Sequence, residues 1–345
     1  MVLAILAIFL LVITQLVDFV KLPQMGGFAM PGTGTGVFEE VTVERGDTEN
    51  QIVVIDVTGV ISAYDSSGTG MNMVNGIKRR LKIAAKDPTT RAVVLRVDSP
   101  GGEVLASDDI AKAIERFQAK ENIPVIASMG SLAASGGYYV SAPCRWIVAH
   151  PLTITGSIGV IMQGFNYRGV MDKIGVTPMV YKSGKYKDML SGMRTPDEIP
   201  ADEQKMVQAL IDQTYDRFKE VVKDGRENAF NKNKGLGFAE DARELGENWQ
   251  EMVDGRVFSG KTAFDNGFVD ELGGLDVAID RAKELAGVSS ARVVKYQVPF
   301  DIGNIFRLLG KSPVGGQAKI TVDLGINTPN VEPGRLYFLS STYVR

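Results

Sequence analysis

The sequence has very few of the residues from which most hydrolytic sites are built. It contains one histidine, His150, and one cysteine, Cys144, among 345 residues. A catalytic zinc site usually takes two or three histidines, and one cysteine permits neither an internal disulfide nor a cysteine-rich metal site. Metal-dependent hydrolysis is therefore disfavoured. Any serine hydrolase that uses histidine as its base would depend on His150 alone.

Neither of these two residues has the surroundings of a catalytic group. His150 precedes a proline at an expected strand end, with no carboxylate next to it, and is interpreted as a surface or structural residue. Cys144 lies in the mostly apolar stretch 138–148 and is interpreted as a small buried hydrophobe. The net charge of −3 gives no indication of a nucleic-acid partner.

Long apolar runs are also rare, and the clearest one opens the chain. Residues 1–17 are apolar except for Thr14 and Gln15. Extending the run to residue 20, past Asp18, gives the roughly 20 residues that a membrane span needs. No basic residue precedes it and no small-residue cleavage site follows, so we predict an uncleaved transmembrane anchor over residues 1–20 rather than a signal peptide.

The rest of the chain divides by composition. Residues 21–48 include a Gly- and Pro-rich stretch and are predicted to be a linker. Residues 49–310 are predicted to be one large folded domain. Residues 311–345 lose their hydrophobic pattern and are predicted to be a C-terminal tail, although the apolar run 336–339 is able to dock on the body.

Within the predicted domain, short apolar runs alternate with helical periodicity. Strands are expected near 51–61, 92–97, 124–128 and 146–149, and helices near 72–85, 104–119, 134–141, 202–223 and 275–286. Alternation of strand, turn and helix is typical of a parallel sheet covered by helices, so the fold class is predicted to be α/β.

Residues 131–139 (SLAASGGYY) place a serine among small residues after an apolar strand. Ala133, Ala134, Gly136 and Gly137 flank Ser135. A nucleophilic serine at a tight strand-to-helix turn leaves no room for larger neighbours, although the G-x-S-x-G form is absent. The Gly136 N–H would be free to donate to an oxyanion. A small-residue helix start packed on a sheet explains the same pattern equally well.

Two further segments offer groups that such a serine would need. The turn 98–102 (DSPGG) follows an expected strand and offers the N–H of Gly101 or Gly102 as a second oxyanion donor, unless it is an ordinary tight turn. Residues 181–190 (YKSGKYKDML) offer three lysines as a base: Lys182, Lys185 and Lys187. A lysine is a base only when neutral, so burial must lower its pKa from about 10.4. Residue types alone do not choose among the three, and a solvated loop is the alternative.

Taken together, five segments in order resemble the signal peptide peptidase A family. They are 98–102, 129–139, 155–161, 182–188 and 254–273. The resemblance covers roughly residues 51–286 and identifies the chain as similar to the short, single-domain members. It implies a Clp-protease/crotonase-like superhelix of repeated ββα units as the fold.

The resemblance also implies a Ser-Lys dyad. Ser135 matches the nucleophile, Lys187 the general base, and Ser157 the serine that hydrogen-bonds the lysine amine. Gly136 matches one oxyanion residue, and the 98–102 turn supplies the other, through Gly101 or Gly102. No metal and no cofactor is implied.

The implied function is a serine endopeptidase that degrades remnant signal peptides and other hydrophobic peptides at a membrane. The family further implies a homo-oligomeric ring or dome, with the N-terminal helix in a bacterial-type cell membrane and the catalytic domain on its non-cytoplasmic side. Two other classes remain: a crotonase-type acyl-CoA enzyme, which would lack a nucleophilic serine, and a catalytically inactive membrane scaffold.

Overall fold

The computed structural model describes residues 38–64, 71–238, 240–298 and 336–339. By its contacts the chain divides into Met1–Glu39 and Glu40–Arg345, and the architecture below is that of the second unit. The predicted anchor over residues 1–20 lies outside the described residues. In the part of the chain that is described, no helix has both the length and the apolar character needed to cross a membrane.

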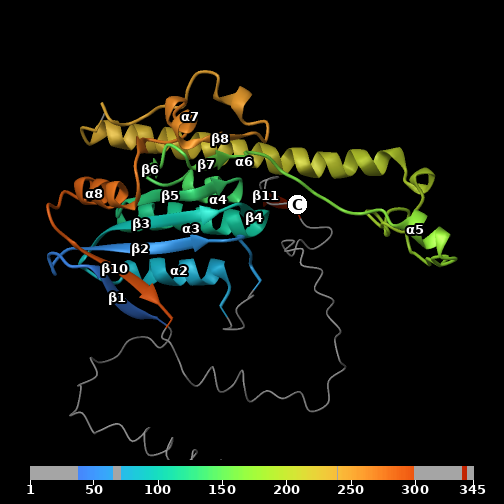
Figure 1. Cartoon of the computed structure of the whole chain (residues 1–345), viewed down its shortest axis with the longest axis horizontal. Coiled ribbons are helices and arrows are strands. Elements are labelled where there is room, and N and C mark those ends of the chain that lie inside the picture. The colour runs from blue at the N-terminus through green and yellow to red at the C-terminus, as the bar shows by residue number, and fades with distance from the viewer. Residues whose placement is uncertain (1–37, 65–70, 239, 299–335, 340–345) are drawn as a thin grey trace, which may run out of the picture. The chain divides into compact units, whose positions relative to one another are not determined.

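A mostly parallel β-sheet forms the centre of this unit (Figure 1). Its strands are β1 (Glu39–Glu44), β2 (Gln51–Thr58), β3 (Thr90–Ser99), β5 (Val125–Ala134), β6 (Trp146–Ala149), β7 (Ile154–Gly156), β8 (Val257–Ser259), β9 (Glu271–Leu272) and β10 (Arg292–Gln297). The main path is β1-β10-β2-β3-β5-β6-β9, and β7 joins β5 to β8. The β10–β2, β2–β3, β3–β5, β5–β6, β6–β9 and β5–β7 pairs are parallel, and β7–β8 is antiparallel.

The central strands are buried on both faces. Ile52 and Val53 point to opposite sides of the sheet, and both are fully buried. The register places Val53 beside Val93 and Val93 beside Val125. Near-continuous apolar runs of this kind are what a parallel sheet covered on two sides requires, and the predicted α/β class is confirmed.

Helices cover both faces of the sheet. The helices are α2 (Met73–Ala84), α3 (Val104–Glu121), α4 (Gly136–Ser141), α5 (Arg168–Lys173), α6 (Ala201–Gly235), α7 (Gly260–Asp265) and α8 (Leu275–Leu285), with 3-10 turns η1 (Pro196–Glu198) and η2 (Trp249–Met252). In Figure 1, α8 lies on one side of the strands and α2 on the other. The core under α8 joins its Ala278 and Ala282 to Ile52 and Ile126.

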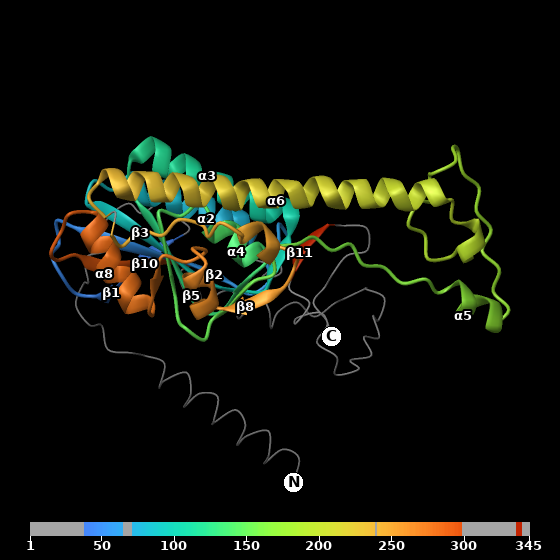
Figure 2. The ribbon, with the colours of Figure 1, turned by 90° about the horizontal axis from the view of Figure 1, so that it is seen from above.

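Helix α6 is longer than the range 202–223 that its apolar stripe predicted. It continues to Gly235 because its C-terminal half packs closely on the body: a Cβ on Gly225 would lie 2.5 Å from the carbonyl oxygen of Ala142. Its N-terminal part extends past the sheet, together with residues 164–200, which contain α5 (Figures 1 and 2). We call residues 164–200 the arm.

Two short strands lie in ranges predicted to be linker or tail. β1 falls within residues 21–48 and is the neighbour of β10 in the sheet. β11 (Tyr337–Leu339) falls within residues 311–345 and pairs with β4 (Gly101–Glu103) in a separate two-stranded sheet. Three residues carry too little pattern to predict a strand, and pairing with a partner more than two hundred residues away leaves no local signal.

Candidate active site

Ser135 lies at the junction between β5 and α4. Its backbone has φ 54° and ψ −116°, a conformation that residues with a side chain rarely adopt. Hydrogen bonds hold it from both sides: its N–H donates to the Gly156 carbonyl at 2.8 Å, and its carbonyl accepts from the Tyr139 N–H at 2.8 Å. Strain of this kind persists only where the surroundings impose it, and it clusters at functional sites.

The Ser135 hydroxyl is buried, and its Oγ has no hydrogen-bond partner in the described part of the chain. Buried polar atoms are nearly always paired, and leaving one unpaired costs about 1–3 kcal/mol. Seven other buried side-chain atoms in the described part of the chain also lack a partner, but of these residues only Ser135 has a strained backbone, which favours a functional group at this turn.

Glycines let three backbone segments meet next to this serine. A Cβ on Gly136 would lie 2.7 Å from the Ser107 Oγ and 3.0 Å from the Gly101 Cα. Gly101 itself has φ 101°, and a Cβ there would lie 2.7 Å from the Gly136 nitrogen. Gly136 is the first residue of α4, so no carbonyl of an earlier helical turn accepts its N–H. The Gly136 nitrogen thus lies next to the 98–102 turn without a helical acceptor for its N–H.

The two glycines of that turn are not equivalent. The Gly101 N–H donates to the Ser99 Oγ at 3.1 Å, and the Gly101 carbonyl accepts from the Ile61 N–H at 2.8 Å. Gly102 stands opposite Phe338 in the β4–β11 pair. The sequence analysis missed Ser99, whose hydroxyl also donates to the Gly59 carbonyl at 2.6 Å and so fixes the turn.

Ser157 lies close to Ser135 because β7 pairs with β5. The register sets Gly156 beside Ala134, one residue before each serine. Ser157 has φ 50°, is almost completely buried, and donates its N–H to the Arg256 carbonyl at 2.7 Å. It lines a cavity of about 460 Å³ together with Gly159, Val160, Ile161, Gln208, Ile211, Asp212, Tyr215, Asp254 and Gly255. The structure thus brings together Ser135, Gly136, Ser157 and the 98–102 turn.

Lys187 is not part of this cluster. It is exposed and lies in the arm, which is tied to the first turns of α6: Leu190 N–H donates to Glu203 at 3.0 Å, and Arg194 pairs with the same carboxylate. At about 1.5 Å per residue, α6 runs about 22 Å from Glu203 to Phe218. Phe218 is where α6 meets Tyr139 of α4, with ring centroids 4.9 Å apart. Within one chain, the arm keeps Lys187 far from Ser135.

The structure does distinguish Lys187 from the two neighbouring lysines. Lys182 pairs with Asp188 at 2.7 Å, and Lys185 pairs with Asp202 at 2.8 Å. The bond to Asp202 raises the pKa of Lys185, and the bonds from Lys185 and Tyr186 lower the pKa of Asp202 to about 2. Within the described residues the Lys187 ammonium has no ion pair or hydrogen bond, so of the three lysines it is the one without an ion-pair partner.

An extended segment of the same chain lies beside the glycine turn. β11 is antiparallel to β4, and on its other side Tyr337 exchanges two hydrogen bonds of 3.2 Å with Ile161. The Phe338 ring is fully buried and packs on Tyr139 and Phe218, with centroids 4.8 Å and 4.6 Å apart. The only sequence signal for this strand was the apolar run 336–339.

The remaining candidates are outside the cluster. His150 is exposed, and its Nδ1 accepts the Leu152 N–H at 3.2 Å. Cys144 is buried, as predicted, and burial raises the pKa of its thiol to about 12. Among the described residues, no group of three or more His, Cys, Asp or Glu side chains is arranged to hold a metal ion.

Comparison with known proteins agrees with this arrangement. The sequence profile of peptidase family S49 matches residues 117–289. The chain belongs to peptidase family S49. This confirms the resemblance to the signal peptide peptidase A family and makes the protein a peptidase.

Relatives of this S49 peptidase carry protease names. A candidate signal peptide peptidase SppA of Enterococcus faecium is 37% identical over 268 residues, covering 76% of this chain and 72% of that protein. A candidate protease of Synechocystis sp. is 38% identical, covering 71% and 78%. Protease 4 of Haemophilus influenzae is 31% identical, and the match covers 83% of this chain but 44% of that protein.

Proposed function

We propose that this S49 peptidase is a serine endopeptidase in which Ser135 is the nucleophile and Lys187 the general base. The observation that carries the proposal is the Ser135 hydroxyl, which is buried and unpartnered at a strained strand-to-helix turn. The free ammonium of Lys187 supports its role over Lys182 and Lys185, which are held in ion pairs.

In the proposed reaction, neutral Lys187 takes the Ser135 proton while Oγ attacks the carbonyl carbon of the peptide bond. The carbonyl electrons move to the oxygen, and the Gly136 N–H stabilises that oxyanion. The 98–102 turn offers the second donor through Gly101 or Gly102; the Gly101 N–H donates to the Ser99 Oγ, and Gly102 pairs with Phe338 of β11. The C–N bond then breaks as the lysine returns the proton to the leaving amine. Water, deprotonated by the same lysine, releases the acyl group from Ser135.

Ser157 is proposed to orient the lysine amine. A neutral amine needs a partner that carries no charge, since a carboxylate would keep it protonated. Ser157 lies beside Ser135 through the β5–β7 pair and borders the 460 Å³ cavity. An amine that enters this cavity would meet Ser157, which adjoins Ser135 through the β5–β7 pair.

We infer that the substrate binds as an extended strand, as β11 does against β4 and Ile161. The buried Phe338 ring between Tyr139 and Phe218 favours a large apolar side chain at this position. Hydrophobic peptides, including remnant signal peptides, are the proposed substrates. The name of the Enterococcus faecium relative supports this substrate class.

Because the arm holds Lys187 far from Ser135, we propose that the dyad is completed between two copies in a homo-oligomeric ring or dome. Several large apolar side chains of the arm are mostly exposed: Tyr181 is 88%, Phe165 83% and Met179 77% exposed. On a second copy, the cavity beside Ser157 is the space that would receive the Lys187 side chain.

The surrounding organisation is proposed on the family resemblance. Residues 49–310 would form the superhelix of ββα units, and residues 1–20 would anchor the chain in a bacterial-type cell membrane. The catalytic domain would then lie on the non-cytoplasmic side, joined to the anchor by the linker 21–48, with 311–345 as the tail.

Mixing two inactive variants tests the dyad and its assembly together. Ser135→Ala and Lys187→Ala are each expected to be inactive on a fluorogenic hydrophobic peptide. If sites form between copies in a head-to-tail ring, random co-assembly at equal amounts restores about one quarter of wild-type activity. No restored activity after co-refolding would place both residues within one chain. A fluorophosphonate probe that labels wild type but not Ser135→Ala separates the peptidase from an acyl-CoA enzyme or an inactive scaffold.

A further inference from the structure

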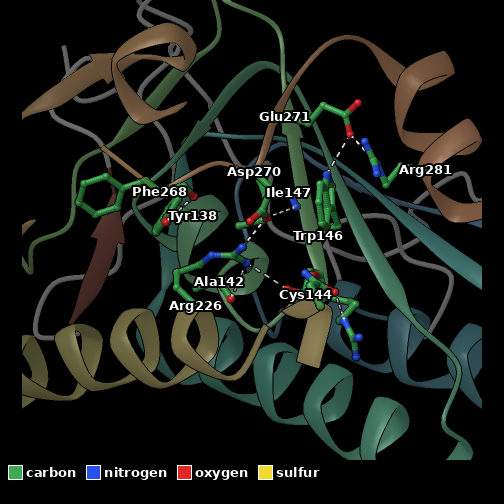
Figure 3. Close-up of polar contacts among 12 residues, drawn as sticks. Tyr138, Ala142, Cys144, Trp146, Ile147, Arg226, Phe268, Asp270, Glu271 and Arg281 are labelled. Carbon is green, nitrogen blue, oxygen red and sulfur yellow. Dashed lines mark hydrogen bonds and ion pairs between the residues drawn. The ribbon is translucent and has the colours of Figure 1, made fainter. Parts of the chain in front are cut away.

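A buried charge pair joins α6 to the segment before β9, and its arginine also reaches the C-terminal end of α4, the helix that follows Ser135 (Figure 3). The side chains of Arg226 and Asp270 pair with each other, and both are completely buried. Arg226 Nη1 also donates to the carbonyl oxygens of Cys144 at 3.1 Å and Ala142 at 3.4 Å. Asp270 accepts the Ile147 N–H at 2.8 Å. One guanidinium thus links α6, the end of α4 and the segment before β9.

Helix α4 depends on such contacts because it is only six residues long. A helix this short has no stability of its own and takes its position from tertiary contacts. Ser135 precedes its first residue, and Ala142 follows its last. The last carbonyls of a helix lack helical partners and favour a nearby positive charge, which Arg226 supplies.

The neighbouring residue of α6, Gly225, also contacts the end of α4, through its backbone rather than through a side chain. A Cβ on Gly225 would lie 2.5 Å from the Ala142 oxygen and 3.1 Å from the Pro143 Cα. The helix backbones therefore touch at this residue, and a methyl group would separate them. Halfway along α4, the Tyr138 hydroxyl donates to the Phe268 carbonyl at 2.8 Å, which attaches the helix to the chain just before Asp270.

We propose that Arg226 is a positioning residue for the nucleophile: with Gly225 it fixes the C-terminal end of α4 and thereby maintains the strained conformation of Ser135 at the other end. The proposal rests on the proposed role of Ser135. At its N-terminal end the helix is held by the Ser135–Gly156 hydrogen bond. Releasing the opposite end lets α4 tilt, which displaces the Ser135 Oγ and the Gly136 N–H together. A displacement of about 1 Å costs on the order of 10²-fold in rate.

Arg226→Lys tests this with little change in charge. A lysine keeps the ion pair with Asp270 but has no planar fork to reach Ala142 and Cys144 as well. We expect kcat to fall roughly 10- to 100-fold, KM to change less than about twofold, and fluorophosphonate labelling of Ser135 to slow in parallel with kcat. Gly225→Ala, which alters no charge, is expected to change kcat in the same direction.

Arg281→Lys is the matched control. Arg281 pairs with Glu271 at 2.9 Å and lies over the Trp146 ring in the same close-up, but it contacts no residue of α4 in the described chain (Figure 3). We expect this variant to lower Tm while kcat stays within about twofold of wild type.

Two results overturn the proposal: kcat in Arg226→Lys no lower than in Arg281→Lys at equal folded fraction, or a normal kcat in Gly225→Ala. If Arg226→Lys does not fold, the Gly225→Ala result decides. Failure of the proposed function is a separate outcome, because it would appear as full activity in Ser135→Ala.

Discussion

The two ends of α6 meet the rest of the molecule in opposite ways. Near its C-terminal end, Arg226 pairs with Asp270 and both side chains are 0% exposed. Near its N-terminal end, the buried Arg194–Glu203 pair joins α6 to the arm rather than to the body, and the Lys185–Asp202 pair beside it has side chains 59% and 46% exposed. Exposed pairs contribute little to stability, whereas breaking a buried pair is costly. The end of α6 near Ser135 is therefore held to the body by a buried pair, whereas the pairs at the other end join α6 to the arm.

The same contrast holds for apolar side chains. Phe218, Val221 and Val222 of α6 are buried on the body, while Met206 and Leu210 of the same helix are 40% and 44% exposed. The apolar stripe of α6 thus continues beyond the body that covers it. An uncovered stripe next to the arm is what a contact between copies would use.

The sharpest test of the comparison is at the nucleophile end. Ser135→Ala is expected to reduce peptide hydrolysis by at least about 10³-fold, because no other group replaces a lost nucleophile. The matched control is Ser131→Ala in the same strand, an exposed position expected to stay within about twofold. Equal activities of the two variants, measured with a fluorogenic peptide, would rule out Ser135 as the nucleophile.

At the arm end, the three lysines are expected to separate. Lys187→Ala should cost about 10³-fold in kcat, since the proposed base is lost. Lys182→Ala and Lys185→Ala break exposed ion pairs and should stay within about threefold. Single-turnover assays on the three variants provide the measurement, and a larger loss in Lys185→Ala than in Lys187→Ala would reassign the base.

The pH profile tests whether the base is a lysine. A lysine acts only when neutral, so kcat/KM should rise toward alkaline pH, by about tenfold per unit below the pKa of the base. The Lys185–Asp202 pair should persist through the acidic part of this range, because the pKa of Asp202 is lowered to about 2 and the pairing is lost only as pH falls toward that value. Activities that are equal at about pH 6 and about pH 9 would contradict a lysine base.

A smaller effect is expected at Ser157, the proposed partner of the lysine amine. Ser157→Ala removes the proposed partner of the lysine amine but leaves the nucleophile and the base, so a loss of about 10- to 100-fold in kcat is expected. The pH profile should shift at the same time. Unchanged kcat and pH profile would mean that the Ser157 hydroxyl serves the local structure only.

The smallest effect concerns β11. Phe338→Asp places a charge between Tyr139 and Phe218 and should release the strand from β4. If β11 competes with substrate for the same edge, kcat/KM for a short peptide rises about two- to fivefold. A decrease, with Tm unchanged, would show instead that β11 forms part of the substrate site.

The sequence predicted the parts of the fold that are governed by local pattern. The apolar runs of β2, β3 and β6 and the periodicity of α2, α3 and α8 each carry their own signal. The C-terminal extension of α6 does not, because Arg226 and Asn233 read as surface residues and are buried only by partners on other elements. β11 is a similar case, since three residues paired with a distant strand show no period.

For the site, the small residues around Ser135 and the family motifs pointed to Ser135, Gly136, Ser157 and the 98–102 turn, which the structure brings together, but they missed the role of Ser99 in fixing that turn. They did not predict its spatial separation from Lys187, because sequence spacing does not reveal that a long helix lies between the two. The choice among the lysines was likewise hidden from the residue types. The family resemblance pointed to Lys187, and the ion pairs of Lys182 with Asp188 and of Lys185 with Asp202 favour the same lysine.

Because α6 is continuous, the number of residues in it sets the direction in which the arm points from the body. Each residue of an α-helix turns the chain by about 100° and advances it by about 1.5 Å. One residue inserted between Glu203 and Tyr215 would therefore swing the arm to another side of the molecule with every side chain of the arm intact. Seven inserted residues would return it to nearly the same heading, about 10 Å farther out. Reach and direction of the lysine are encoded in helix length, and an insertion series would measure the tolerance of each separately.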